Sequence, residues 1–236
     1  MQENETAKFF DTYSDRFDSI YGNENSLLNK VVNCLWRKSM KLRYLKTLEG
    51  CTPIDGKTVL DIGCGPGHFS IALAQRGAKK VFGIDFADGM IDLAKERAKQ
   101  AGVADHCEFR KADFFDHQLL EQFDYSILMG FMDYMANPAS VIERIVKITR
   151  CKAFFSFPEG GTFLAWQRKI RYRNRCDLFL YSHEQIANLF RDADADDIKI
   201  EKISRDFFVT ACLERSIRSQ AESPTAVLIS EGNSRQ

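Results

Sequence analysis

The residues with the clearest chemical potential form one short run, D-I-G-C-G-P-G, from Asp61 to Gly67. An apolar stretch ends at the carboxylate, and glycines then stand at every second position, at 63, 65 and 67. Glycine adopts positive φ angles that other residues avoid, and it lets the main chain come close to a ligand. A strand that leads through such a turn into a helix is how open α/β folds bind nucleotide-like molecules. The run therefore predicts a site for a nucleotide-like ligand at the end of a strand.

Two further carboxylates follow the next predicted strands. Asp85 closes the run V-F-G-I, 22 residues after Gly63, where an acidic residue accepts the hydroxyls of a ribose. Asp113 follows the third predicted strand, although an aspartate there also fits an ordinary turn. The dinucleotide pattern G-x-G-x-x-G needs glycine at position 68, where the chain has His68. A NAD-dependent oxidoreductase is therefore an outside alternative only.

Strand-like and helix-like patterns alternate through the part of the chain that must position these residues. The predicted strands lie near 58–62, 80–84, 106–110, 123–129 and 151–157. The predicted helices lie at 5–21, 26–50, 67–76, 88–101, 117–121, 138–149 and 183–192. Such alternation predicts an α/β fold, with a mostly parallel sheet and helices on both faces. Two last strands, near 197–203 and 206–213, are too close for a crossover helix and so complete seven strands as an antiparallel C-terminal hairpin.

The segments on either side of this core differ from it in pattern. Helical patterns precede it and predict an N-terminal helical cap over 1–52. The core spans 53–214 and contains an insertion at about 158–182. Polar residues dominate 215–236, which predicts a disordered tail.

The composition argues against several kinds of partner and site. The 33 basic and 33 acidic residues cancel, so no overall field favours nucleic acid or an anionic membrane. The seven cysteines are scattered without a C-x-x-C pair, which predicts reduced thiols, no disulfide framework, no metal site and a cytoplasmic location. No stretch has the roughly 18 apolar residues of a membrane-spanning helix, and the polar N-terminus does not resemble a signal peptide.

An acidic residue two positions before three alternating glycines resembles motif I of the class I S-adenosylmethionine-dependent methyltransferases. The resemblance covers about residues 55–213 and implies a Rossmann-like core that binds S-adenosylmethionine and releases S-adenosylhomocysteine. In this family the counterpart of Asp61 meets the methionine amine, that of Asp85 the ribose, and that of Asp113 the adenine. The resemblance implies these cofactor-binding residues: Asp61, Gly63, Cys64, Gly65, Gly67, Asp85, Phe86, Met90, Ala112, Asp113, Phe114, Met129, Gly130, Tyr13 and Tyr21. Of these, Met90 fits a place in the hydrophobic core equally well.

Family members place residues that face the acceptor just after the fourth strand, where this chain has Asp133 and Tyr134. Asp133 would act as a general base toward an amine or hydroxyl, and Tyr134 would orient the acceptor. Either residue equally fits a cap of the next helix. His68 directly follows the glycine loop and is a third catalytic candidate, with a structural role as its alternative. Alignment with an activated sulfonium carries much of the reaction, so few side chains need to be catalytic.

The segment from Phe9 to Asp18 resembles the N-terminal cap that many small-molecule members fold over the cofactor. Tyr13 and Tyr21 are the candidates to cover the sulfonium. The alternative is an amphipathic helix that is simply buried on the core.

A basic, aromatic stretch at 166–175 lies in the insertion, where small-molecule methyltransferases form the acceptor pocket. Its arginines favour an anionic group and its apolar neighbours an amphipathic acid, with the substrate candidates Arg168, Arg171, Trp166 and Tyr172. The stretch also fits RNA, whose splayed bases stack on arginine and aromatic side chains, or a solvated helix face. The order of segments here is similar to that of magnesium-protoporphyrin O-methyltransferases.

The sequence thus predicts a cytoplasmic S-adenosylmethionine-dependent methyltransferase, monomeric or homodimeric, that acts on an oxygen or nitrogen of a small, anionic or amphipathic acceptor. The alternatives are an RNA methyltransferase that uses 166–175, and a non-catalytic member that only binds the cofactor.

Overall fold

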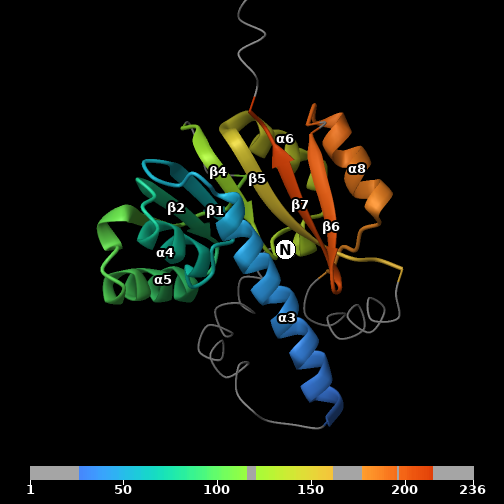
Figure 1. The fold of residues 1–236 in the computed structure, drawn as a ribbon, viewed down its shortest axis with the longest axis horizontal. Helices are drawn as coiled ribbons and strands as arrows, with labels where there is room; N and C mark the ends of the chain where they lie inside the picture. Colours follow the sequence, from blue (N-terminus) through green and yellow to red (C-terminus); the bar gives the residue numbers. More distant parts are fainter. Residues whose placement is uncertain (1–26, 116–120, 162–176, 196, 215–236) are drawn as a thin grey trace, which may run out of the picture.

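A seven-stranded sheet organises the chain in the computed structural model, which describes residues 27–115, 121–161, 177–195 and 197–214 (Figure 1). Its strands are β1 (Thr58–Ile62), β2 (Lys80–Asp85), β3 (Cys107–Lys111), β4 (Phe123–Leu128), β5 (Thr149–Pro158), β6 (Ile198–Ile203) and β7 (Asp206–Cys212). The order across the sheet is β3-β2-β1-β4-β5-β7-β6. The first five of these strands are parallel, and β7 runs antiparallel to both of its neighbours. The predicted fold, a mostly parallel sheet with an antiparallel C-terminal hairpin, is confirmed.

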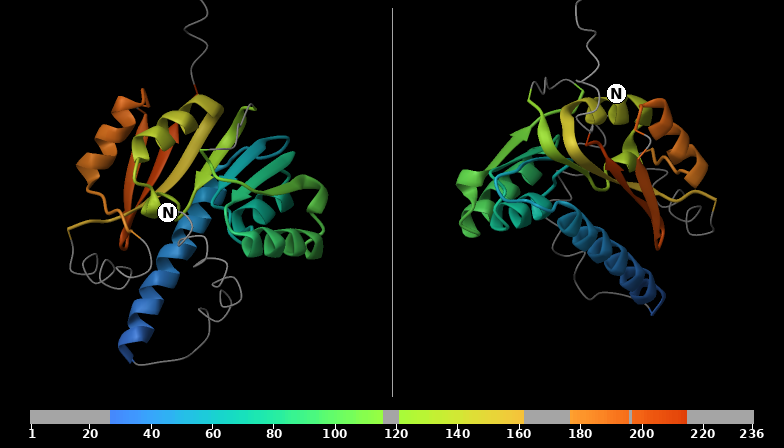
Figure 2. Two further views of the ribbon diagram at one scale, coloured as in Figure 1. Left: turned by 180° about the vertical axis from the view of Figure 1, so that it is seen from behind. Right: turned by 45° about the horizontal axis from the view of Figure 1, so that its top comes forward.

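The helices lie on both faces of this sheet (Figure 2). They are α3 (Leu27–Gly50), α4 (His68–Gln75), α5 (Asp88–Gln100), α6 (Pro138–Ile148) and α8 (His183–Asp192), with 3₁₀ turns η1 (Ala104–His106) and η2 (Met132–Tyr134). Strand side chains alternate between the two faces: Val59 packs among α3–α5 residues, and Leu60 among α6 and α8 residues. Strands buried on both faces are apolar almost throughout, which is why β1, β2 and β4 appear in the sequence as continuous apolar runs.

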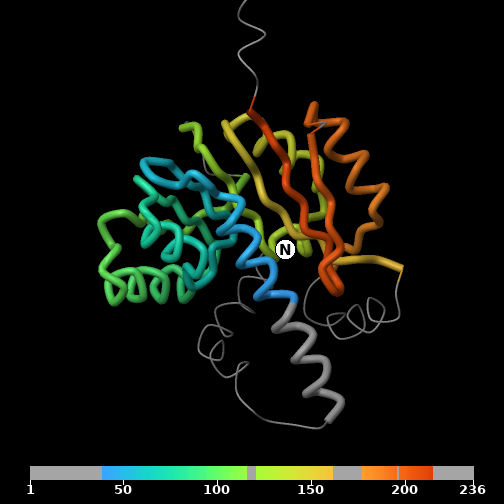
Figure 3. Tube along the Cα trace, in the orientation of Figure 1, coloured from blue at the N-terminus to red at the C-terminus, as the bar shows by residue number. Residues whose placement is uncertain are grey.

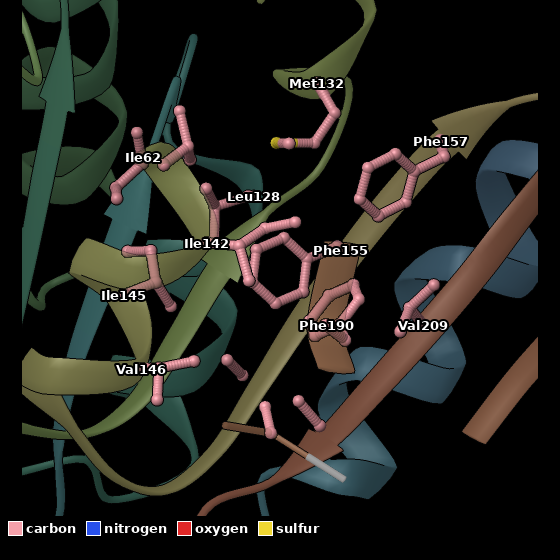
Figure 4. Close-up of a cluster of buried hydrophobic side chains, with 14 of the residues drawn as sticks. Ile62, Leu128, Met132, Ile142, Ile145, Val146, Phe155, Phe157, Phe190 and Val209 are labelled. Atoms are coloured by element: carbon pink, nitrogen blue, oxygen red, sulfur yellow. The ribbon is translucent and has the colours of Figure 1, made fainter. Parts of the chain in front are cut away.

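The core on the face covered by α6 and α8 combines aliphatic side chains with a group of aromatic rings (Figure 4). Phe155 and Phe157 project from β5, and Phe190 of α8 meets the Phe155 ring edge-on at 5.0 Å between centroids. Ile142 and Ile145 of α6 complete the contact. These large rings fix the position of β5, whose carboxyl end carries Ser156 and Pro158.

The last part of α3 lies on the face that also carries α4 and α5 (Figure 3). It is tied to the C-terminal hairpin by polar contacts: the Ser39 hydroxyl donates to Asp206 Oδ2 at 3.1 Å, and Arg43 lies 3.6 Å from the same oxygen. A third contact joins Lys46 to Glu201 at 3.0 Å.

Predicted and observed element boundaries agree within two residues, apart from the predicted helices at 5–21 and 117–121, which lie wholly or mainly outside the described residues. The turns η1 and η2 were not predicted, because three residues give no periodic signal. None of the helices in the described residues has the length and apolar character that crossing a membrane requires.

Asp124 joins the amino-terminal ends of β1 and β4, and its loss should destabilise the fold. Its carboxylate accepts from the Thr58 N–H at 2.9 Å, the Thr58 hydroxyl at 3.0 Å and Lys57 Nζ at 3.2 Å. Burial acts against its charge, but these bonds outweigh burial and hold the pKa of Asp124 below its usual value. Asp124→Ala should therefore lower the free energy of unfolding by about 2–4 kcal/mol in urea titrations at pH 7.

The depressed pKa also fixes the pH dependence of this contribution. Asp124 stabilises the fold at neutral pH, and the contribution is lost as the pH falls below about 4 through the folded-state pKa. The stability gap between the parent and Asp124→Ala should therefore close in acid. An equal gap at pH 7 and pH 3 would contradict this account.

Candidate functional site

The glycine loop between β1 and α4 is a fixed turn at the carboxyl end of the sheet. Gly63, Gly65 and Gly67 have φ angles of 66°, 51° and 78°, in the region that favours glycine. The N–H groups of Gly63 and Cys64 both donate to the Ile84 carbonyl, at 2.9 and 3.0 Å. The loop is thus held to the end of β2 by main-chain bonds and cannot easily recede from a ligand.

The three glycines differ in what a side chain would meet. A Cβ at Gly63 would lie 3.2 Å from the Phe131 ring, and one at Gly67 would lie 3.1 Å from Phe109. A Cβ at Gly65 would meet no heavy atom within 4 Å. The outer two glycines are therefore needed for packing, whereas Gly65 leaves open space beside the loop.

Asp61 is a buried carboxyl at the end of β1. It accepts from the Ser70 hydroxyl of α4 at 2.6 Å. Burial raises its pKa to about 7, against the lowering effect of the Ser70 bonds, and the nearby charge of Asp85 adds to the rise. The carboxyl therefore titrates near neutral pH, and a cation placed beside it would favour its charged form.

Cys64, between the first two glycines, is also buried. Burial, and then the charges of Asp61 and Asp85, raise the pKa of its thiol. The thiol stays neutral, so its role in the loop is packing rather than chemistry.

Asp85, the last residue of β2, fastens the glycine loop to the start of α5. Its Oδ2 accepts from the Gly65 N–H at 2.9 Å, and its Oδ1 accepts from the Ala87 N–H at 3.0 Å. Asp85 is buried, with 8% of its surface exposed. The aspartate predicted to bind ribose thus also holds the predicted cofactor loop in place. Phe86 follows it and is half-buried, and Met90 is buried in the first turn of α5.

The segment after β3 lies beside Asp85. The Ala112 N–H donates to the Asp85 carbonyl at 3.0 Å, and Asp113 accepts from the Phe115 N–H at 2.7 Å. Asp113 therefore makes the ordinary turn considered as its alternative, and it remains half-exposed. Phe114 is buried and its ring meets that of Phe131 edge-on at 6.0 Å.

Two residues far away in sequence support these segments. Arg144 of α6 places its guanidinium 4.6 Å from the centre of the Phe114 ring and donates to the Phe114 carbonyl. Ser156 of β5 is buried, and its hydroxyl accepts from the Gly130 N–H at 2.7 Å. Sequence reasoning missed both, because nothing in the local pattern connects an arginine or serine to a turn that distant.

The carboxyl ends of β1, β2 and β4 form one edge of the sheet, with β1 and β4 adjacent at the switch in strand order. Ligands of open α/β sheets bind at such a switch point. The sheet brings the segments that begin at Asp61, Asp85, Ala112 and Met129 to this edge. Gly130 has φ 77° and open space where a Cβ would lie, as Gly65 does.

The candidate catalytic residues differ in their surroundings. Asp133 and Tyr134 form the turn η2 just after Gly130; Asp133 is buried and Tyr134 is half-buried. His68 begins α4 on the exposed side of the loop, with Nε2 3.3 Å from Arg97 Nη1. In the described segments no group of three or more His, Cys, Asp or Glu side chains is arranged to hold a metal ion.

Several predicted residues lie outside the described part of the chain. These are the cap candidates Tyr13 and Tyr21 and the substrate candidates Trp166, Arg168, Arg171 and Tyr172. The residues that flank the insertion are tied together, since the Gly160 N–H donates to the Tyr181 carbonyl at 2.8 Å. The insertion therefore begins and ends at the carboxyl end of β5.

Comparison with known proteins agrees with this geometry. A family model described as a methyltransferase domain matches residues 54–166. The magnesium-protoporphyrin O-methyltransferase of Rhodobacter capsulatus is 31% identical over 183 residues, which are 75% of this chain and 77% of that protein. A ubiquinone biosynthesis O-methyltransferase of Neisseria meningitidis serogroup A is 26% identical over 161 residues, 64% of this chain and 65% of that protein, just under two thirds of its length.

The fold is also that of a solved methyltransferase. The crystal structure of magnesium protoporphyrin IX methyltransferase from Synechocystis PCC 6803 with bound SAH superposes with a TM-score of 0.68 at 20% identity. The superposition covers 89% of this chain and 99% of that one. The glycine loop, the strand order and the Rhodobacter relative all support one conclusion. The chain belongs to the class I S-adenosylmethionine-dependent methyltransferases and is an enzyme whose methyl donor is S-adenosylmethionine.

Proposed function

We propose that this enzyme transfers the methyl group to an oxygen of a small, anionic and amphipathic acceptor. The observation that carries the proposal is the 31% identity to a magnesium-protoporphyrin O-methyltransferase, because it extends over three quarters of both chains. The relative's name specifies O-methylation of a magnesium porphyrin, a small molecule that has an apolar ring and acidic propionates. The basic and aromatic composition of the insertion at 166–175 suits such an acceptor.

The residues at the sheet edge suit the cofactor's chemistry. Asp61, as a buried carboxylate, would hold the ammonium of the methionine moiety. Asp85 would accept from the ribose hydroxyls and Asp113 from the adenine amine, with Phe114 fixing the adenine segment. The open space beside Gly65 gives the cofactor room against the main chain. When bound, S-adenosylmethionine supplies a methyl carbon activated by its sulfonium.

The turn η2 would face the acceptor and control its proton. A hydroxyl acceptor loses a proton as its oxygen bonds to the methyl carbon, and Asp133 would take that proton. A carboxylate acceptor brings no proton, so it needs alignment and exclusion of water but no base. Tyr134 would orient the acceptor from the same turn. The role of Asp133 therefore depends on which oxygen is methylated.

The experiment that tests the function uses S-adenosylmethionine labelled in the methyl group. Magnesium protoporphyrin IX serves as a carboxylate acceptor and 3,4-dihydroxybenzoate as a phenolic one. We expect label in the porphyrin as a methyl ester, which alkali releases as methanol, whereas an ether from the phenol would resist alkali. Cofactor binding without transfer to either acceptor would contradict the proposal.

Replacement of Asp133 by asparagine should separate the two kinds of acceptor. For a hydroxyl acceptor we expect kcat to fall about 100-fold, because the variant cannot take the proton. For a carboxylate acceptor we expect kcat to change less than about threefold, because there is no proton to take. In both cases the affinity for S-adenosylmethionine should stay constant by calorimetry. Undiminished methylation of a hydroxyl would refute the role of Asp133 as a base.

Cofactor affinity should depend on pH through Asp61. Since burial raises the pKa of Asp61 to about 7, the carboxyl is largely protonated at pH 5.5 and half ionised near pH 7. The ammonium of the cofactor stays charged over this range, so affinity should rise about tenfold from pH 5.5 to 7. Calorimetry across the range measures this. Asp61→Asn should bind weakly at every pH, and a flat profile in the parent protein would contradict the assignment.

The same raised pKa affects the ligand-free protein in the opposite sense. The folded chain binds the Asp61 proton more tightly than the unfolded chain does, so this contribution to stability is present below about pH 4 and is lost as the pH rises to about 7. The Asp61→Asn variant should lack this loss. Thermal unfolding of both ligand-free proteins at pH 5 and pH 7.5 would show it.

A further inference from the structure

The four residues that lead into α8 form a short connection between β5 and η2. The Tyr181 N–H donates to the Pro158 carbonyl at 2.9 Å, and the Tyr181 carbonyl accepts from Gly160 at 2.8 Å. Two residues earlier, the Phe179 N–H donates to the Asp133 carbonyl at 2.9 Å. The chain that leaves the insertion is therefore bonded on one side to the end of β5 and on the other to the turn that carries Asp133.

The Tyr181 side chain makes the same connection a second time. Its hydroxyl lies 3.2 Å from the Met132 carbonyl, where η2 begins, and 3.4 Å from the Met135 carbonyl, just after η2, so its single proton is shared between these two acceptors. The side chain is buried, and its ring meets that of Phe157 edge-on at 5.0 Å. Burial, and then the charge of Asp133, raise the pKa of Tyr181 to about 12, so the hydroxyl keeps its proton at working pH.

The turn η2 has little internal support of its own. It is one 3₁₀ turn, in which the Tyr134 N–H donates to Phe131 at 3.2 Å and the Met135 N–H donates to Met132 at 3.5 Å. Short 3₁₀ turns have poor hydrogen-bond geometry and depend on outside contacts. Methyl transfer requires the nucleophile, methyl carbon and sulfur in line, so a small displacement of residues facing the acceptor slows it strongly.

We propose that Tyr181 is a positioning residue for methyl transfer, whose hydroxyl fixes η2 and thereby Asp133 and Tyr134. The inference rests on the proposed function only in that η2 faces the acceptor. Tyr181 lies near the C-terminal end of the insertion, so its hydroxyl joins that end of the insertion to η2. The residue acts through main-chain carbonyls and touches neither reactant.

The test compares two tyrosines that make the same kind of bond at different places. Tyr181→Phe removes the hydroxyl and keeps the ring contact with Phe157. Tyr125→Phe is the matched control: Tyr125 is also buried, and its hydroxyl donates to the Pro53 carbonyl at 2.8 Å, outside the edge that carries the glycine loop. Both variants should lose a similar few degrees of melting temperature.

Kinetics should then separate them. With magnesium protoporphyrin IX as the acceptor, we expect kcat to fall about tenfold in Tyr181→Phe and to stay within twofold of the parent in Tyr125→Phe. The dissociation constant for S-adenosylmethionine should be unchanged in both. An equal loss of kcat in the two variants, or none in Tyr181→Phe, would overturn the proposal.

A second readout does not depend on the acceptor. In protein saturated with S-adenosylhomocysteine, hydrogen exchange at the amides of Tyr134 and Met135 should be about tenfold faster in Tyr181→Phe and unchanged in Tyr125→Phe. If neither the porphyrin nor the phenolic acceptor is methylated, the function proposal fails, and exchange still decides whether Tyr181 holds η2. Unchanged exchange in Tyr181→Phe would reject the inference even if the enzyme methylates the porphyrin.

Discussion

Asp85→Ala should lower the affinity for both S-adenosylmethionine and S-adenosylhomocysteine by at least about 100-fold, because it removes two functions at once. The carboxylate holds the Gly65 and Ala87 N–H groups at 2.9 and 3.0 Å, so it sets the shape of the loop. It would also accept from the ribose hydroxyls. Hydrogen bonds to a charged group contribute about 1.5–3 kcal/mol each, and two of them amount to at least a hundredfold in binding. Calorimetric titration of both ligands measures the loss.

Two controls make this result specific. Asp124→Ala removes another buried aspartate that accepts main-chain and side-chain bonds, but at the amino-terminal ends of the strands. It should cost stability and leave cofactor affinity intact. The 2′-deoxy analogue of S-adenosylhomocysteine separates the effect of Asp85 on the loop from its effect on the ribose. The analogue should bind the parent protein more weakly than S-adenosylhomocysteine does. The Asp85→Ala variant should bind both ligands with equal affinity. Parental affinity in Asp85→Ala would exclude the site.

The sequence was sufficient for the fold because its signals are local. The alternation of apolar runs with helical patterns predicted each strand of the sheet. The short spacing between the last two predicted strands anticipated the antiparallel pairing of β6 with β7. The glycine loop and Asp85 could be predicted equally well. A turn that needs positive φ angles requires glycines, and a ribose-binding carboxylate stands at a fixed offset from them, so both features are visible in one short stretch of sequence.

The supporting residues could not be predicted in the same way. Ser156, Arg144 and Tyr181 each stabilise a turn that is 26 or more residues away in the chain. Their side-chain types are common in strands, helices and loops, so only the packed sheet shows which carbonyl or N–H they meet. The place of Asp133 after the fourth strand predicts that it faces the acceptor, but only the structure shows that it is buried and that its carbonyl accepts from the Phe179 N–H. Long-range contacts of this kind decide how firmly a site is held.

The substitution Gly65→Ala should lower cofactor affinity by about 100-fold or more while the protein stays folded. The added methyl group would meet no protein atom within 4 Å, so it would project into the space proposed for the cofactor. The loop cannot withdraw, because Gly63 and Cys64 are bonded to Ile84 and Gly65 to Asp85. A ligand must then shift by about a methyl radius and lose its bonds to Asp85, which corresponds to about 3 kcal/mol.

Gly102→Ala is the matched control, since it imposes the same backbone strain elsewhere. Gly102 has φ 70° against 51° at Gly65, and a Cβ there would also meet nothing within 4 Å. Both variants should therefore lose about 1–2 kcal/mol of stability from the left-handed conformation. Only Gly65→Ala should lose affinity for S-adenosylmethionine, and equal affinity in the two would mean that the cofactor does not approach the loop at Gly65. Gly63→Ala gives the third comparison: its Cβ would press on Phe131 at 3.2 Å, so its main effect should be on stability.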